Sequence, residues 1–174
     1  MSEFVWPVRV YYEDTDSGGV VYYANYLKFM ERARTEFLRV HGFEQTDLIR
    51  DYGVIFVVRD VHISYLRPAV FNDLLNVTVS VHAAGRSWIE FSQTVVRSPL
   101  PCPLLKGAPA RGVPAGIGGE IAQSGEKGDE ELLCKPNKAE ILSRAQVKIV
   151  CVNHLSFKPV EIPEIIRNKL ELSS

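Results

Sequence analysis

Residues 12–42 read YEDTDSGGVVYYANYLKFMERARTEFLRVHG and combine a glycine turn with a long amphipathic segment. Apolar residues recur at helical spacing along the second part and form a stripe that would bury one side of a helix. The stripe consists of Tyr26, Met30, Ala33, Phe37 and Val40. We therefore expect a helix that is capped by Asn25, runs to about His41 and is followed by Gly42.

The segments around this helix alternate between apolar and polar residues, or are rich in β-branched residues, as strands are. The predicted strands span residues 6–12, 54–66, 75–82, 88–97 and 145–151. A short hairpin turn is expected at 84–87, and a short helix at about 163–170. One buried helix with four long antiparallel strands predicts an α+β fold in which the sheet wraps around the helix. Such a sheet has open edges, so we expect at least a dimer.

The chain has 174 residues, enough for a single domain spanning residues 1–174. Within it, residues 98–140 are rich in proline and glycine, a composition that resists both helix and strand. This stretch is too long for an ordinary connection. We interpret it as a mobile insertion in a hairpin, with a docked lid or a partner-binding arm as the alternative.

Composition excludes several classes of function. The net charge of -1 gives no general attraction to nucleic acid or to an anionic membrane. The three cysteines have neither metal-ligand spacing nor an even count, so no metal site or disulfide framework is expected. The first residues lack the pattern of a signal peptide, and no apolar run is long enough to span a bilayer. We therefore expect a cytoplasmic protein without metal or cofactor.

The glycine turn is the best candidate for chemistry. Gly18 and Gly19 allow a tight turn and close approach to a ligand, and the helix start that follows offers unpaired N–H groups. A carboxylate such as Asp16 could attack, or direct water at, a carbonyl that those N–H groups polarise. Asp16 could instead only cap the turn. For Asp14 we favour a structural role in the bend, and for Tyr22 and Tyr26 a role as core aromatic residues.

The sequence VRVYYEDTDSGGVVY (8–22), with ERARTE at 31–36, resembles the YbgC-type acyl-CoA thioesterases of the 4-hydroxybenzoyl-CoA thioesterase group. The resemblance covers about 6–97 and 143–159, and it includes Arg67-Pro68-Ala69 and Asp73. It implies a hotdog fold, hydrolysis of acyl-CoA and a homodimer or homotetramer. It also implies an association with the Tol-Pal envelope system in bacteria.

By the same resemblance, Asp16 is the catalytic carboxylate and the backbone N–H of Tyr23 polarises the thioester carbonyl. Tyr12 matches a tyrosine that some members place near the site. YbgC-type members commonly have histidine in place of Tyr23, so this chain keeps the backbone role but lacks the side-chain one. Gly19, Val20 and Val21 are expected to contact the substrate.

Turns at the end of the hairpin provide a second candidate region. In this fold such turns often meet the nucleotide phosphates of CoA across a subunit boundary, which makes Arg86 and Ser87 candidates for that role. Arg59 and Arg97 are weaker candidates of the same kind. The alternative for each is a solvated surface charge.

The predicted function is hydrolysis of a short-chain aliphatic or aromatic acyl-CoA to a free acid and CoA, in which Asp16 acts as a nucleophile or as a general base. The alternative is a non-catalytic or weakly catalytic protein that binds acyl carrier protein or the Tol-Pal system. Dehydration of an acyl thioester would usually need a histidine beside the acid, and no histidine lies in the active segment.

Overall fold

The computed structural model describes residues 3–98 and 140–172. The helices are α1 (Asn25–Val40), α2 (Gln45–Tyr52) and α3 (Glu164–Lys169), and a 3₁₀ turn spans Tyr12–Asp14. The strands are β1 (Phe4–Arg9), β2 (Val54–Tyr65), β3 (Leu74–Ala84), β4 (Trp88–Arg97) and β5 (Glu140–Asn153). The predicted insertion at about 98–140 falls almost entirely outside the described residues.

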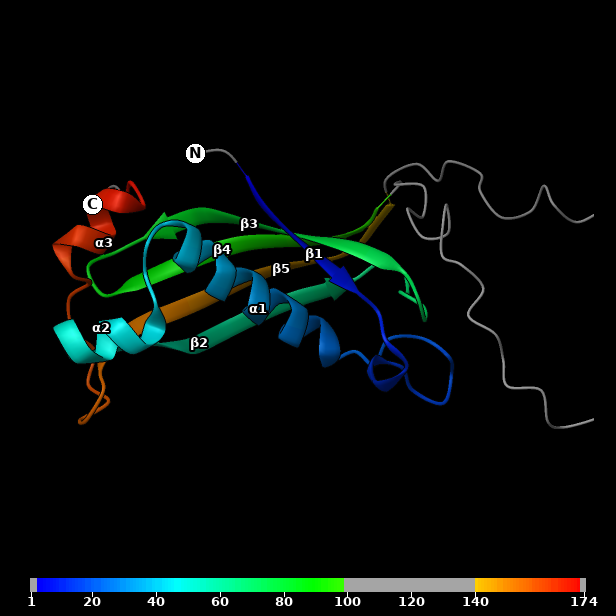
Figure 1. Ribbon diagram of the computed structural model, residues 1–174, viewed down its shortest axis with the longest axis horizontal. Coiled ribbons are helices and arrows are strands. Elements are labelled where there is room, and N and C mark those ends of the chain that lie inside the picture. The colour runs from blue at the N-terminus through cyan, green and yellow to red at the C-terminus, as the bar shows by residue number, and fades with distance from the viewer. Residues whose placement is uncertain (1–2, 99–139, 173–174) are drawn as a thin grey trace, which may run out of the picture. The chain divides into compact units, whose positions relative to one another are not determined.

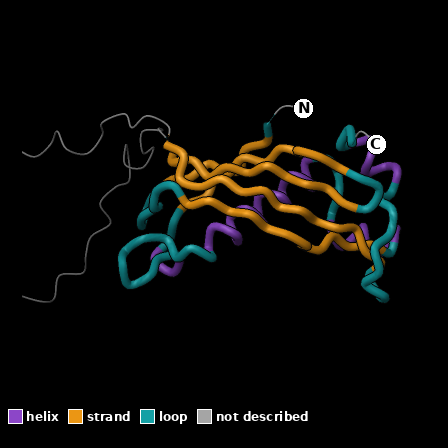
Figure 2. The backbone as a smooth tube through the Cα atoms, turned by 180° about the vertical axis from the view of Figure 1, so that it is seen from behind, coloured by secondary structure: helices purple, strands orange, loops and turns teal. Residues whose placement is uncertain are grey.

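The five strands form one sheet in the order β1-β3-β4-β5-β2, and every neighbouring pair is antiparallel. Helix α1 lies across one face of this sheet, and the view from behind shows the strands in front of it (Figure 1, Figure 2). Strands β1 and β2 are the two edges. The predicted α+β architecture, an antiparallel sheet around one long helix, is confirmed.

The core lies between α1 and the sheet. Phe29, Met30 and Ala33 have no exposed surface, and the ring of Phe37 meets that of Phe91 on β4 edge-on at 5.8 Å between centroids. Most of the predicted apolar stripe is therefore buried, because helical spacing places those side chains on one face. Val40 is an exception: it ends the helix and is 64% exposed.

Several local predictions at the ends of elements are wrong. Asn25 is not the cap but the first helical residue, and its buried side chain donates a hydrogen bond to the Asp14 carbonyl at 3.0 Å. The first strand ends at Arg9, so Tyr12 lies in the 3₁₀ turn and is exposed rather than on the apolar strand face. Tyr22 is likewise exposed rather than in the core. Gly42 follows the helix with a φ of 87°, as predicted.

Candidate active site

The loop that carries Asp16 is closed by a short ladder of backbone contacts. Tyr22 N–H donates to Asp14 O at 2.9 Å, Thr15 pairs with Val21, and Asp16 N–H donates to Val20 O at 2.9 Å. At the tip, Gly19 adopts a φ of 74°, in the left-handed region that favours glycine. The ladder gives the tip a defined conformation although its residues are exposed.

The Asp16 carboxylate is only half engaged. Its Oδ1 atom accepts the Gly18 N–H at 2.8 Å. Its Oδ2 atom has no hydrogen-bond partner among residues 3–98 and 140–172. The turn-capping role that the sequence allows is therefore real, but it uses one oxygen and leaves the other free for chemistry.

Asp14 has the structural role predicted for it. Its side chain is buried and its Oδ2 atom accepts the Tyr11 N–H at 2.9 Å, while its carbonyl accepts hydrogen bonds from both Tyr22 and Asn25. These contacts join the strand end, the loop and the helix start. The two carboxylates of the motif thus have different roles. Asp14 is buried and stabilises the loop, whereas Asp16 is exposed to solvent.

The N-terminus of α1 presents free donors beside this loop. The first helical hydrogen bond of the turn is that from Asn25 N–H to Tyr22 O at 2.8 Å. In the described part of the chain, the N–H of Tyr23 has no acceptor. The Tyr23 carbonyl, in the next peptide group, accepts the Tyr65 hydroxyl at 2.9 Å, which ties this residue to the end of β2. An oxyanion could therefore be met by the Tyr23 N–H and by the positive end of the helix dipole.

A strap formed by residues 68–73 holds the loop and the helix start together. Val21 N–H donates to Ala69 O at 2.8 Å, and Ala69 N–H donates to the Tyr26 hydroxyl at 2.8 Å. Burial raises the pKa of Tyr26 above its ordinary value, so the hydroxyl stays neutral. Tyr26 is buried as predicted, but sequence reasoning missed that its hydroxyl anchors the strap.

Arg97 secures the other side of the strap. Its guanidinium donates to Pro68 O at 2.7 Å and pairs with Asp73 at 3.0 Å and with Glu140. The Asp73 carboxylate in turn accepts the Val70 N–H at 2.9 Å. These contacts occupy the Arg97 guanidinium within one chain, and its role in binding phosphate, for which the sequence made it a weaker candidate, stays a prediction. No sequence pattern pointed to this network.

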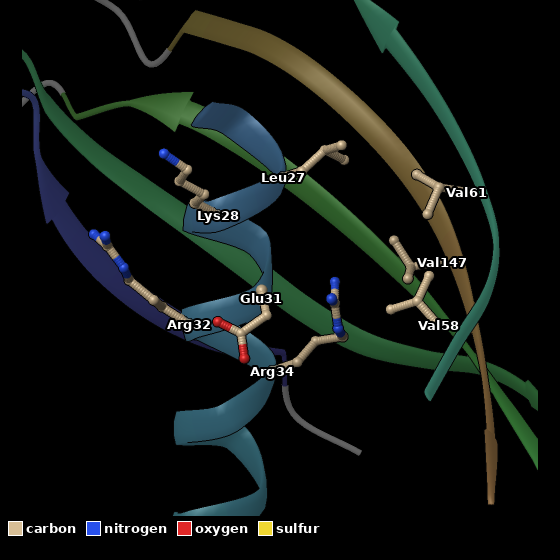
Figure 3. Close-up of a pocket in the computed structure, with 8 residues that line it drawn as sticks. All are labelled: Leu27, Lys28, Glu31, Arg32, Arg34, Val58, Val61 and Val147. Atoms are coloured by element: carbon tan, nitrogen blue, oxygen red, sulfur yellow. The ribbon is translucent and has the colours of Figure 1, made fainter. Parts of the chain in front are cut away.

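A groove runs between α1 and β2 from the helix start. One pocket of about 270 Å³ lies at its beginning and is lined by Val21, Tyr23, Tyr26 and residues 65–68. A larger one of about 460 Å³ lies further along α1, where Leu27 and Arg34 face Val58, Val61 and Val147 (Figure 3). The groove thus combines apolar walls with a start beside the free N–H of Tyr23, as a site for an acyl group requires.

Arg86 and Ser87 lie far from Asp16 within one chain. They form the β3–β4 turn, at the opposite end of the sheet from the loop (Figure 1). Arg86 makes an exposed ion pair with Glu161 at 3.1 Å, and Ser87 O accepts the Cys151 N–H. A role in binding phosphate at the site would need a second subunit, and it stays a prediction. Tyr12 is on the loop, and its exposed ring packs edge-on against Phe71.

The described residues contain no cluster of three or more metal-ligating side chains. The same part of the chain holds no helix that is both long and apolar enough to cross a membrane.

Comparison with known proteins identifies relatives along most of the chain. The thioesterase superfamily model matches residues 18–102. The acyl-CoA thioester hydrolase YbgC of Escherichia coli O157:H7 is 34% identical over 94% of this chain and 92% of its own length. The acyl-CoA thioesterase YbgC of Haemophilus influenzae is 35% identical over 94% of this chain and 91% of its own.

Solved structures agree with the fold. A probable thioesterase from Bartonella henselae superposes with a TM-score of 0.66 at 28% identity, covering 93% of this chain and 100% of its own. The 1,4-dihydroxy-2-naphthoyl-CoA thioesterase from Synechocystis gives 0.68 at 18% identity, covering 97% and 96%. The hotdog fold expected from the sequence is confirmed.

Proposed function

The chain belongs to the YbgC family of acyl-CoA thioesterases, and we propose that it hydrolyses the thioester bond of an acyl-CoA to give a free acid and CoA. Two observations support this proposal. In the described residues the Oδ2 atom of Asp16 accepts no hydrogen bond, and the N–H of Tyr23, at the start of α1 after the same loop, donates none. A nucleophile or base and a donor for the oxyanion are the two parts that acyl transfer needs.

In the proposed reaction, the thioester carbonyl accepts a hydrogen bond from the Tyr23 N–H, and the helix dipole stabilises charge that develops on its oxygen. The Asp16 carboxylate then has two possible roles. As a nucleophile it forms a mixed anhydride and expels CoA thiolate, and water then cleaves the anhydride. As a general base it takes a proton from the water that attacks the carbonyl.

Substitution of Asp16 tests the proposal. Asp16→Asn should lower kcat by about 100-fold or more, the usual loss when an acid–base group is removed. Glu13→Gln is the matched control, because it neutralises an exposed carboxylate on the same loop without touching the ladder. The assay is release of CoA thiol from an acyl-CoA panel. An Asp16→Asn protein that keeps most of the wild-type rate would contradict the proposal.

The same panel addresses what the substrate is. Short aliphatic, longer aliphatic and aromatic CoA esters should be compared with an acyl carrier protein thioester, since a carrier protein is the second candidate source of the acyl group. Single-turnover hydrolysis in ¹⁸O-labelled water tests for the anhydride route. Label in the Asp16 carboxylate indicates this route with water attacking the Asp16 carbon, whereas attack at the acyl carbon and general-base catalysis both leave Asp16 unlabelled.

We also propose that two copies pair through β2. This edge strand has 12 residues and no proline, and it carries exposed Val58, Val61 and Tyr65. The other edge, β1, has 6 residues and contains Pro7, which cannot donate to a neighbouring strand. A long edge strand with exposed apolar side chains is expected to be covered, and a second copy of the chain would cover it.

Sedimentation tests this pairing. Val61→Lys should convert the dimer to a monomer, because it places a charge in the proposed interface, and it should also slow hydrolysis, because Val61 borders the groove. Val5→Lys, at an exposed position on β1, should leave the dimer unchanged. A monomeric wild-type protein, or equal effects of the two substitutions, would contradict pairing through β2. The cytoplasmic location expected from the sequence stays a prediction.

A further inference from the structure

The groove between α1 and β2 follows one face of the helix. Leu27 and Arg34 stand on that face seven residues apart, so their side chains align along the groove, and Tyr23 lies just before the helix at the start of the groove. On the opposite wall, Tyr65 borders the pocket at the helix start, whereas Val61 and Val58 border the larger pocket further along. The two pockets share no lining residue, but the neighbours Tyr26 and Leu27 on α1 border one each, so the pockets follow one another along the helix and are together called the channel.

Arg34 is the cation that points into this channel. Figure 3 shows its guanidinium between α1 and the valines, whereas the Lys28 and Arg32 side chains point away from the valines. Burial lowers the pKa of Arg34 to about 10, so the group is still charged at neutral pH. The far part of the channel thus combines an apolar wall with one inward-facing positive charge.

No carboxylate forms an ion pair with this charge in the part of the chain that the structure describes, although the negative charge of Glu31, which lines the same pocket, partly offsets the lowering of the Arg34 pKa by burial. Arg34 Nη1 donates to the neutral Gln93 Oε1 atom at 2.6 Å. The nearby carboxylate of Glu31 accepts the Thr35 hydroxyl at 2.9 Å and makes no ion pair with Arg34. A partly buried guanidinium with five donors and only a neutral acceptor is an unusual arrangement, because buried charges are normally paired.

Gln93 is held so that it presents its oxygen to Arg34. Its side chain is buried and its Nε2 atom donates to the Met30 carbonyl at 3.0 Å. The amide therefore cannot turn to offer its nitrogen, and the guanidinium is fixed in place. A cation held in this way is ready to bind an anion that enters the channel.

The length of the channel defines what can reach Arg34. Arg34 lies nine positions after Asn25, the first residue of α1, which corresponds to about 14 Å along the helix axis. The side chain of Arg34 leans toward the N-terminus of the helix, so the guanidinium is closer to the reaction site than its α carbon is. An acyl chain of medium length would span this gap past Leu27 and Val61.

We propose that Arg34 determines substrate specificity by binding a carboxylate at the far end of the acyl chain, so that the favoured substrates are ω-carboxyacyl-CoA esters of medium length. This proposal rests on the proposed thioesterase function. The thioester lies at Tyr23 and Asp16, the methylene chain lies along the valines, and the terminal carboxylate pairs with the guanidinium.

Matched pairs of substrates test the proposal. Hexanoyl-CoA is compared with adipoyl-CoA, and octanoyl-CoA with suberoyl-CoA, because each pair differs only in whether the chain ends in a methyl group or a carboxylate. The wild-type protein should show a higher kcat/KM for the carboxylate of at least one pair, by about tenfold or more, as a charge-assisted hydrogen bond predicts.

Substitution of Arg34 should remove that preference selectively. Arg34→Met should lower kcat/KM for the ω-carboxy ester by about 10- to 100-fold more than that for the methyl-ended ester. Arg34→Lys keeps the charge and should retain part of the preference. Arg39→Met, on the same helix but exposed and outside the channel, is the matched control. Thermal melting checks that each variant folds.

The outcomes separate the inference from the function on which it rests. If no ester is hydrolysed, the proposed function fails. If both members of each pair are hydrolysed equally by the wild type, only the role of Arg34 fails, whether or not Arg34→Met folds. The role also fails if Arg34→Met slows both esters alike, or if its main effect in sedimentation is loss of the dimer, because Arg34 would then serve the structure or the interface.

Discussion

The loop that carries Asp16 and the channel along α1 and β2 begin at the same helix start, but they are stabilised in different ways. The loop is exposed, and its shape is maintained by a backbone ladder and by the strap of residues 68–73. Ala69 in the strap bonds to the loop and to Tyr26, and Arg97 secures the strap from the other side. The channel is formed by apolar side chains that are partly exposed on an edge strand. The loss of a single hydrogen bond at the loop should therefore lower the free energy of unfolding. A substitution in the channel should change that free energy little and should instead change which substrates are hydrolysed.

Arg97→Met should have the largest effect on the loop. The side chain is 21% exposed and ties Pro68, Asp73 and Glu140 together. Breaking such a pair leaves carboxylates unpaired, and we expect a loss of about 2–3 kcal/mol in the free energy of unfolding, together with a lower kcat. Arg67→Met removes an ion pair with the same Glu140 from a side chain that is 66% exposed, and should cost less than about 1 kcal/mol. Urea unfolding measures the free energy of unfolding of both variants. Equal losses for Arg97→Met and Arg67→Met would contradict the importance of the contact between Arg97 and the strap.

Tyr26→Phe should have the next largest effect. It removes the hydroxyl that accepts the buried Ala69 N–H and leaves that donor unsatisfied, which costs about 1–2 kcal/mol. Tyr65→Phe also removes a single hydroxyl hydrogen bond, but at an exposed position, and should cost about 0.5 kcal/mol. Chemical denaturation compares the two variants. A larger loss for Tyr65→Phe would contradict the importance of the strap.

The two glycines of the loop should respond differently to alanine. Gly19→Ala is strained by the φ of 74° although nothing lies near the new Cβ atom, and should cost about 1 kcal/mol of stability. In Gly18→Ala the new Cβ atom would lie 3.1 Å from Asp16 Oδ1 and displace the carboxylate. That variant should lose more activity than stability. Thermal melts and thiol-release rates on both proteins test the difference, and an unchanged rate for Gly18→Ala would show that the position of the carboxylate is not critical.

Val61→Thr should have the smallest effect on stability. The side chain is 37% exposed and lies on the channel wall, so we expect a change within about 0.5 kcal/mol. The KM for a methyl-ended acyl-CoA should rise, because the added hydroxyl lowers the affinity of an apolar wall for the chain. A large loss of stability with no change in KM would mean that the channel wall belongs to the core.

The elements that were predicted correctly carry strong local signals. The extent of α1 follows from its apolar stripe, and β4 begins and ends at Trp88 and Arg97, as its alternation and the preceding turn indicate. Helix α2 was missed because its sequence, QTDLIRDY, buries only Leu48 and so lacks an apolar stripe. Tyr22 was assigned to the core because it is aromatic, but it lies on the exposed loop just before the helix.

The spacing and composition of the sequence by themselves determined an α+β fold around one buried helix, the place of Asp16 on a glycine turn and the helix start that follows it. These features depend on residues that are neighbours along the chain. The hotdog fold and the role of the Tyr23 N–H were implied by the resemblance to the YbgC-type thioesterases. Only the tertiary structure decided that Arg97 secures the strap, that Tyr26 anchors it and that Arg34 faces the channel beside Gln93. Each of these contacts joins residues at least 29 positions apart in the sequence, and pairing over such separations is fixed by how the strands and α1 pack.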